Sequence, residues 1–261
     1  MDFVADLHLH TTNSDGELTL EALPDAARRA DLEAVAVTDH DRLHPELDDP
    51  VQELGGITVI HGIELKVETD QRVDLLGYGV TRTDALTAEI TRLQRDRVER
   101  GAKIIANVEA ELGIDLDLEP REGLGRPHIA RAVEAHPGTE LDFQGAFDEL
   151  IADGRPCFVA REVTAFGRGL ELLSAACAFV GLAHPFRYDD PDAALRLTDE
   201  LDAVERWYPY EAAVDETLLD VVVESNDLLE TGGSDAHDDR LGVAGVPGDA
   251  FEPIRQRLGI D

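Results

Sequence analysis

Five short apolar runs recur along the chain, and each of them ends in histidine or acidic residues. They are FVADLHLH (3–10), EAVAVTDHD (33–41), GITVIHGIEL (56–65), AFVGLAHP (178–185) and LLETGGSDAH (228–237). Short runs rich in valine, isoleucine and leucine are typical of buried strands. A helical pattern, TLEALPDAARRADL (19–32), follows the first run, with Thr19 as its expected N-cap. Strands that alternate with helices predict a parallel α/β sheet or barrel.

The polar ends of these runs indicate where the chemistry lies. Enzymes built on barrels place their reactive residues at the carboxyl ends of the strands. Side chains alternate along a strand, so His8 and His10 should share one face, opposite the apolar positions 3, 5, 7 and 9. The pair is followed by Asp15 and matched by His40 on the next run, which core packing alone explains poorly. Because neutral imidazole binds zinc, manganese and iron, this set predicts a metal site.

Residues 84–165 interrupt the alternation of strands and helices. The stretch 84–112 is long, contains no proline and precedes Gly113, which is typical of a helix stop. Further helical patterns follow over 123–138 and then to about Ile151. The expected division is a barrel, a helical cap over the polar end of the barrel, and the barrel again: residues 1–83, 84–165 and 166–261.

The composition excludes several classes of protein. With 261 residues, 43% of them hydrophobic, the chain can bury a large core. No apolar run is long enough to span a membrane and the N-terminus lacks a signal-peptide pattern, so we expect a cytoplasmic protein. Cys157 and Cys177 form neither a CxxC motif nor a disulfide framework and are expected to be ordinary thiols.

The charge is strongly negative, since 56 acidic and 23 basic residues give −33. Lys66 and Lys103 are the only lysines, and the acidic residues are spread through the chain. This spread predicts adaptation of the whole surface to a high-salt cytoplasm, with an acidic protein of a low-salt cell as the alternative. In either case bulk electrostatics exclude binding to long nucleic acid. Any phosphate must be held by local arginines or by metal.

The polar motifs, taken in chain order, resemble those of a known family. DLHLHTTNSDG, VTDHD, GIE, GLAHP and GGSDAH are similar to the motifs of the polymerase and histidinol phosphatase (PHP) superfamily of metal-dependent phosphoesterases. The resemblance implies a distorted (β/α)7 barrel that is similar to a TIM barrel. It also implies two or three bound divalent metal ions. Manganese, iron and zinc are the first candidates for these ions, and magnesium is a further one. It implies these ligands: His8, His10, Asp15, His40, Glu64, His184, Asp235 and His237.

The stretch VDLLGYG (73–79) departs from the family pattern, because Asp74 stands where a histidine is usual. Aspartate binds the same hard and borderline metals, and strand alternation would point it inward. Two interpretations stay open. Asp74 binds the ion shared with Glu64 and His184, which we favour, or it pairs with Arg72 outside the site. The departure also leaves the occupancy of a third ion open.

The insertion resembles one branch of the superfamily, similar to nucleoside-phosphate phosphoesterases and a 5′→3′ exoribonuclease. That branch carries RxxR and GRPHIAR stretches, which correspond here to Arg97, Arg100, Arg126, His128 and Arg131. Arginine binds phosphate through two hydrogen bonds at once, so the resemblance implies a site for a substrate phosphate. The alternative is a solvated helix face with paired charges.

These observations lead to a metal-dependent phosphoesterase as the expected function. Bound metal lowers the pKa of water and clamps phosphoryl oxygens, so no lysine or serine nucleophile is needed. We expect a small substrate: a nucleoside phosphate, a nucleoside 3′,5′-bisphosphate or the 5′ end of a short RNA. An amidohydrolase is one alternative. Many amidohydrolases bridge two metal ions with a carboxylated lysine, and only Lys66 lies near the end of an expected strand here. A PHP-like domain that lacks catalysis and serves as a metal-bound scaffold or nucleotide sensor is another.

Other polar residues are weaker candidates, and the general acid stays unassigned. His61 should face away from the metals, because its spacing from Glu64 is odd. Glu205 could lie near the site beside Trp207 and Tyr208, which offer a stacking surface for a base, but core packing is favoured. Two histidines precede prolines in loops and are expected at the surface: His44 and His136.

Overall fold

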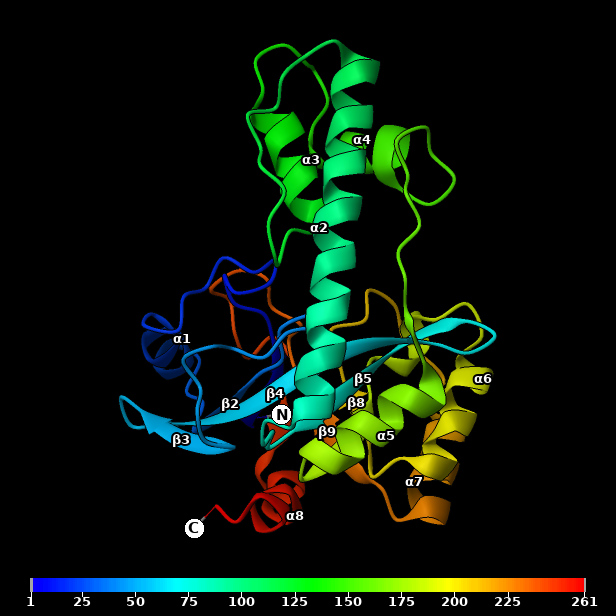
Figure 1. The fold of residues 1–261 in the computed structure, drawn as a ribbon. Helices are drawn as coiled ribbons and strands as arrows, with labels where there is room; N and C mark the ends of the chain where they lie inside the picture. Colours follow the sequence, from blue (N-terminus) through cyan, green and yellow to red (C-terminus); the bar gives the residue numbers. More distant parts are fainter. Residues whose placement is uncertain (1, 261) are drawn as a thin grey trace. The chain divides into compact units, whose positions relative to one another are not determined.

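The computed structural model describes residues 2–260, which form two compact units (Figure 1). The first, the barrel unit, runs up to Thr87 and resumes at Val163. The second, the inserted unit, is Ala88–Glu162. Each unit has its own buried apolar core, as expected of domains that pack separately.

In the described part of the barrel unit, seven strands follow one another around a sheet that nearly closes. The segment after the last strand reaches the first, because the Asp235 N–H donates to the His8 carbonyl at 2.7 Å and the His10 N–H to the Ala236 carbonyl at 2.9 Å. This confirms the distorted seven-stranded barrel. In sheet order the strands are β1 (Phe3–Leu9), β2 (Ala34–Val37), β4 (Ile57–Glu68), β5 (Arg72–Tyr78), β7 (Phe179–Leu182), β8 (Ala203–Trp207) and β9 (Leu229–Gly232). Short strands pair with β4 or β1: β3 (Val51–Leu54), β6 (Thr164–Ala165) and β10 (Val246–Pro247).

The expectation of a wholly parallel sheet is wrong for β5, which runs antiparallel to β4 and to β7. Residues 69–71 alone join β4 to β5, and so short a connection makes a hairpin rather than the helical crossover that parallel strands need. The first half of β5 therefore lies beside the carboxyl half of β4. In this register Asp74 stands opposite Lys66.

The helix predicted over 19–32 begins later than expected. Thr19 closes a turn ahead of the helix, and its hydroxyl accepts from the Ala22 N–H at 3.3 Å. Pro24, which has no N–H to satisfy, stands in the first helical turn. Across residues 2–260 no helix combines the length and apolar character that a membrane crossing requires. The helices of the barrel unit are α1 (Leu23–Arg29), α5 (Phe166–Ala176), α6 (Pro191–Arg196), α7 (Thr217–Asn226) and α8 (Gly248–Leu258), with 3₁₀ turns at Pro185–Arg187 and Leu197–Glu200.

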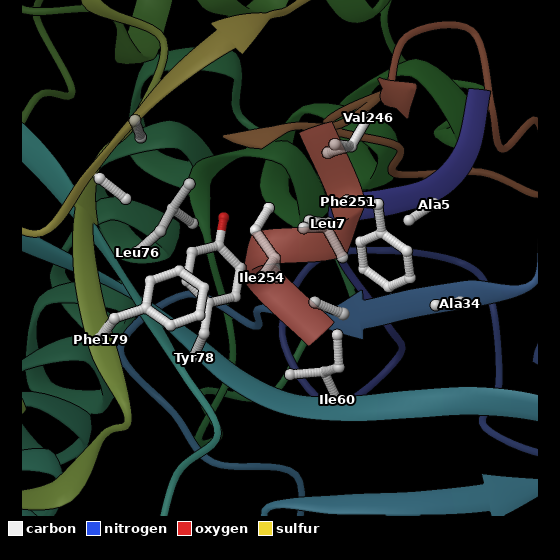
Figure 2. Close-up of a cluster of buried hydrophobic side chains, with 13 residues drawn as sticks. Ala5, Leu7, Ala34, Ile60, Leu76, Tyr78, Phe179, Val246, Phe251 and Ile254 are labelled. Atoms are coloured by element: carbon white, nitrogen blue, oxygen red, sulfur yellow. The ribbon is translucent and has the colours of Figure 1, made fainter. Parts of the chain in front are cut away.

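Two clusters of buried apolar side chains flank β1 in the described part of the barrel unit. One gathers Leu7 with the aromatic pair Tyr78 and Phe179 and with Ile254 of α8 (Figure 2). The other packs Leu9 against the buried face of α1. Leu7 and Leu9 therefore do not share a face of β1. The expectation that the apolar positions 3, 5, 7 and 9 all face one way is wrong. The register of β1 against β2 shifts after position 6, and such an irregularity re-aims the side chains that follow.

The inserted unit is helical. The helix α2 has the predicted bounds, and Gly113 follows it with a φ of 67°, a conformation that favours glycine. Cys157 lies in the core of this unit, and both it and Cys177 are free thiols. The helices are α2 (Asp84–Leu112), which starts in the barrel unit, α3 (Arg126–Ala135) and α4 (Phe143–Ala146), which continues as a π-helical turn at Phe147–Ile151.

Candidate metal centre

The polar ends of the apolar runs converge in the barrel unit. His8 of β1 and His10, which directly follows the strand, are fully buried, and their ring centroids lie 5.3 Å apart. Glu64 of β4 lies beside His40, to which its backbone is bridged. His184 follows β7 and is nearly as buried as His8 and His10. The loop after β9 adds the last two candidate ligands, Asp235 and His237.

Three groups of side chains have ligand atoms close enough to share a metal ion, all within 4.8 Å of one another. Two of the histidines each belong to two groups, so the three positions adjoin. The groups contain all eight residues that the family resemblance implied as ligands. They are His10, Asp15, His40 and His237; His8, His10 and Asp235; and His8, Glu64 and His184.

Glu64 links the groups through both of its oxygens. Its Oε2 lies 2.7 Å from His40 Nδ1, 3.3 Å from His10 Nε2 and 3.5 Å from His8 Nε2. Its Oε1 lies 3.2 Å from His184 Nε2. A carboxylate whose two oxygens face different imidazoles can serve two adjacent cations.

The donor atoms fit divalent metal ions. Several buried ring nitrogens of these histidines have no hydrogen-bond partner, among them His8 Nε2, His10 Nδ1 and His184 Nδ1. Burying such atoms unpaired is costly, and a metal ion would satisfy them. Imidazole nitrogen combined with carboxylate oxygen suits manganese, iron or zinc. His184 and Asp235 also hold φ angles of 26° and 50°, a backbone strain that clusters at functional sites.

Neighbouring charges keep the acids of the centre ionised. Burial alone would raise the pKa of Asp235, but His8 and His10 together outweigh it and hold that pKa below its usual range. Burial alone would lower the pKa of His40, but Glu64 and Asp15 outweigh it and raise that pKa to about 9. Metal binding at His40 would therefore have to displace a proton from its ring.

The sequence match extends this geometry to a family. Residues 6–146 match the model of the PHP domain. The chain belongs to the PHP domain family. The match ends before His184, Asp235 and His237, which the barrel fold brings to the same centre.

Curated proteins similar to this PHP chain act on phosphate esters. The chain is 26% identical over 248 residues to the phosphoribosyl 1,2-cyclic phosphate 1,2-diphosphodiesterase of Eggerthella lenta, covering 90% of this chain and 94% of that one. It is 26% identical over 250 residues to the 5′-3′ exoribonuclease Rnm of Escherichia coli, covering 90% and 85%. It is 28% identical over 194 residues to the 3′,5′-nucleoside bisphosphate phosphatase of Chromobacterium violaceum, covering 70% and 67%.

Solved structures share the fold of the PHP chain. A predicted metal-dependent phosphoesterase of Bifidobacterium adolescentis has a TM-score of 0.76 at 22% identity, covering 97% of this chain and 96% of that one. An amidohydrolase of Chromobacterium violaceum, with bound sulfate and no metal, has a TM-score of 0.77 at 22% identity with the same coverage. At this identity the likeness shows the fold alone.

Asp74 lies beside the PHP metal centre with a partner that sequence reasoning missed. Its Oδ2 is 2.5 Å from Lys66 Nζ and 3.9 Å from His184 Nε2. Among the described residues it is absent from the three ligand groups. Arg72 pairs with Glu68 instead, so the alternative of an Asp74–Arg72 pair is wrong. Alternation along β5 could not reveal Lys66, because that residue stands on the neighbouring strand.

Glu205 of β8, for which core packing was favoured, supports the metal centre directly. It is fully buried, with Oε1 3.0 Å from His8 Nδ1. Its Oε2 accepts from the His184 N–H at 2.7 Å. A carboxylate on Nδ1 sets the tautomer of His8 and leaves Nε2 facing the centre. The sequence did contain a signal for this role, because Glu205 is an acid within the strand sequence AVERW.

Four other histidines lie outside the ligand groups, within the described part of the chain, and one of them, His128, belongs to α3 of the inserted unit. His61 is buried, and burial followed by the charge of Arg82 lowers its pKa to about 4. His44 was expected at the surface but is buried. Its loop is held by Arg82, which donates a hydrogen bond to the His44 carbonyl at 2.7 Å. His136 is half-buried in the loop after α3.

The arginines of the insertion lie close together within the inserted unit. Arg97 and Arg100 of α2 are each 9% exposed, and Arg100 Nε donates to the Val159 carbonyl at 2.6 Å. Burial and then the charges of Arg126, Arg161 and Arg97 lower the pKa of Arg100 to about 10. These four residues are the arginine cluster, of which sequence reasoning missed Arg161.

Other predicted phosphate-binding side chains have partners inside the same unit. His128 Nδ1 accepts from the Gly125 N–H at 3.1 Å and so caps α3. Arg131 lies over the Phe143 ring, 5.9 Å from its centroid. Arg126 donates to Asp153 Oδ1 at 2.8 Å and to the Ile151 carbonyl at 3.2 Å.

Proposed function

We propose that this PHP chain is a metal-dependent phosphoesterase. The observation that carries the proposal is the set of three adjoining ligand groups, linked by Glu64, in which buried imidazole nitrogens lack hydrogen-bond partners. Two or three ions of manganese, iron or zinc suit these donors. When bound, they lower the pKa of water and polarise phosphoryl oxygens. Glu205 orients His8 for this task, and Glu64 joins the ion positions.

The proposed substrate is a small ribose phosphate: a nucleoside phosphate, a nucleoside 3′,5′-bisphosphate or the 5′ end of a short RNA. The names of the three relatives described above point to a cyclic phosphate of ribose, to RNA and to a nucleoside bisphosphate. In the inserted unit, the arginine cluster supplies positive charge to a chain whose net charge is −33, and it suits a phosphate group of the substrate. Bulk attraction to long nucleic acid plays no part in this proposal.

Metal removal tests the proposed reaction. Protein loaded with manganese should release phosphate from adenosine 3′,5′-bisphosphate, and chelation should lower the rate at least about 100-fold, because the metals supply the activated water. Restoring manganese should restore the rate. Stoichiometric binding of metal and nucleotide without any turnover would contradict the proposal and favour a scaffold or nucleotide sensor.

The amidohydrolase alternative is less well supported. A carboxylated lysine bridging two metals requires an uncharged amine, and Lys66 is the lysine beside the centre. Its Nζ lies 2.5 Å from Asp74 Oδ2, so this amine already pairs with a carboxylate.

The arginine cluster should discriminate between substrates with one and two phosphates. Arg126→Ala is expected to cost about 1.5–3 kcal/mol in kcat/KM for a bisphosphate, the usual worth of a charged hydrogen bond. The loss for adenosine monophosphate should be much smaller, because that substrate has no second phosphate for Arg126 to bind. Arg95→Ala, an exposed position on α2, is the matched control. Equal losses for both substrates would show that Arg126 does not bind a second phosphate.

We also infer adaptation to a high-salt cytoplasm, supported by the net charge of −33 and the scarcity of lysine. Raising KCl from 0.1 M to about 1 M shortens the Debye length from about 10 Å to about 3 Å and screens the repulsion among the acids. The Tm from thermal unfolding should therefore rise by several degrees. A constant or falling Tm would contradict the adaptation.

A further inference from the structure

Asp235 uses its two oxygens differently. Its Oδ1 lies 3.0 Å from His10 Nε2 and 3.6 Å from His8 Nε2, so it faces the ligand groups. Its Oδ2 accepts from the Tyr208 hydroxyl at 2.9 Å and from Arg187 Nη1 at 3.1 Å. One side of this carboxylate therefore belongs to the metal centre, and the other holds a guanidinium next to it.

Only one of the three guanidinium nitrogens of Arg187, Nη1, takes part in these contacts. Its Nη1 also donates to the Tyr208 hydroxyl at 2.8 Å, and the guanidinium lies over the Tyr208 ring, 5.7 Å from the centroid. Within the described residues, the opposite edge, formed by Nε and Nη2, contacts no acceptor. The side chain is 53% exposed. A fixed, half-exposed guanidinium with an open edge can accept two oxygens of one anion.

The backbone fixes where this edge lies. Arg187 ends the 3₁₀ turn that follows the candidate ligand His184, and its N–H donates to the His184 carbonyl at 2.9 Å. Tyr208 follows β8, the strand that carries Glu205. Arg187 is therefore held from two neighbouring strands, within a few residues of the groups that orient the centre.

We propose that Arg187 binds the scissile phosphate of the substrate through its Nε–Nη2 edge, while Nη1 stays on Asp235 and Tyr208. This assignment rests on the proposed phosphoesterase function and names a residue of the barrel unit, separate from the arginine cluster. A planar guanidinium matches two phosphate oxygens, which leaves the remaining oxygens to the metal ions. Lysine would keep the charge but lose the paired geometry.

Binding of inorganic phosphate to manganese-loaded protein, measured by calorimetry, tests this assignment directly. Arg187→Gln should weaken phosphate binding about 10- to 100-fold, and Arg187→Lys should recover only part of the loss. Metal stoichiometry and metal affinity should stay within about twofold of the parent protein. The matched control is Arg168→Gln, which removes a side chain of similar exposure, 47%, from an ion pair on α5.

The outcomes separate the possible roles of Arg187. Unchanged phosphate binding in Arg187→Gln would overturn the proposal. Loss of metal in parallel with phosphate would also overturn it, because Arg187 would then act by holding Asp235. Tyr208→Phe, which removes one donor from Asp235 but keeps the guanidinium, should retain most phosphate affinity. Failure of the parent protein to hydrolyse any phosphate ester would refute the proposed reaction. The calorimetric measurement of phosphate binding would still test the role of Arg187, because it does not depend on turnover.

Discussion

The double variant His8→Ala with His10→Ala should lose its bound metal and lose activity at least about 1,000-fold. The two imidazoles take part in all three ligand groups, so no candidate ion position survives their removal intact. Metal catalysis is worth several kcal/mol, and each 1.36 kcal/mol is a factor of ten in rate. Elemental analysis and the rate of phosphate release measure the two losses.

A matched variant separates this effect from a general loss of structure. His136→Ala removes an imidazole from the inserted unit, outside the ligand groups, and should keep metal content and rate. Circular dichroism should show that the double variant keeps its secondary structure, because the barrel strands pair through their backbones. A folded double variant with the metal content of the parent protein would remove His8 and His10 from the centre.

Glu205→Gln should lower metal affinity about 10- to 100-fold, the usual effect of removing a carboxylate that orients a ligand histidine. The amide keeps the shape of the side chain but loses the charge that favours the tautomer of His8 with Nε2 toward the metal. Glu205→Leu should cost more, because it leaves His8 Nδ1 and the His184 N–H buried without an acceptor. Each such orphaned group destabilises the fold by about 1–3 kcal/mol.

Metal titration measures the loss of metal affinity when His8 is no longer oriented. Thermal unfolding measures the loss of stability when buried groups are left without an acceptor. Glu205→Gln should change affinity more than Tm, and Glu205→Leu should lower both. Glu224→Gln, an exposed acid of α7, is the control for the lost charge. Metal affinity in Glu205→Gln equal to that of the parent would return Glu205 to the role of core packing that the sequence favoured.

Local patterns in the sequence pointed to part of the centre. The spacing of His8 and His10 on an apolar run, with Asp15 after it and His40 on the next run, predicted a metal site, and the resemblance to the PHP family implied the full set of eight residues that the three groups contain. The bounds of α2 followed from an unbroken helical stretch before Gly113. These features depend on periods of two or 3.6 residues, which are written into neighbouring positions.

Features that depend on the partner strand could not be read in this way. Asp74 invited a choice between metal and Arg72, yet its partner Lys66 stands opposite it only because β5 turns back along β4. The shift in register after Asp6 likewise separated Leu7 from Leu9. Neither the direction of a strand nor a bulge changes the alternation that the sequence displays.

By itself, the sequence determined the α/β barrel fold, because strand and helix patterns are written in the order of neighbouring residues. It also predicted a set of metal ligands and a helical insertion. Only the tertiary structure decided which polar groups support that chemistry. Glu205 meets His8 across 197 positions of the chain, and Arg187 meets Asp235 across 48. Such contacts exist because the barrel closes and brings the ends of distant strands to one place, where burial makes every polar atom require a partner.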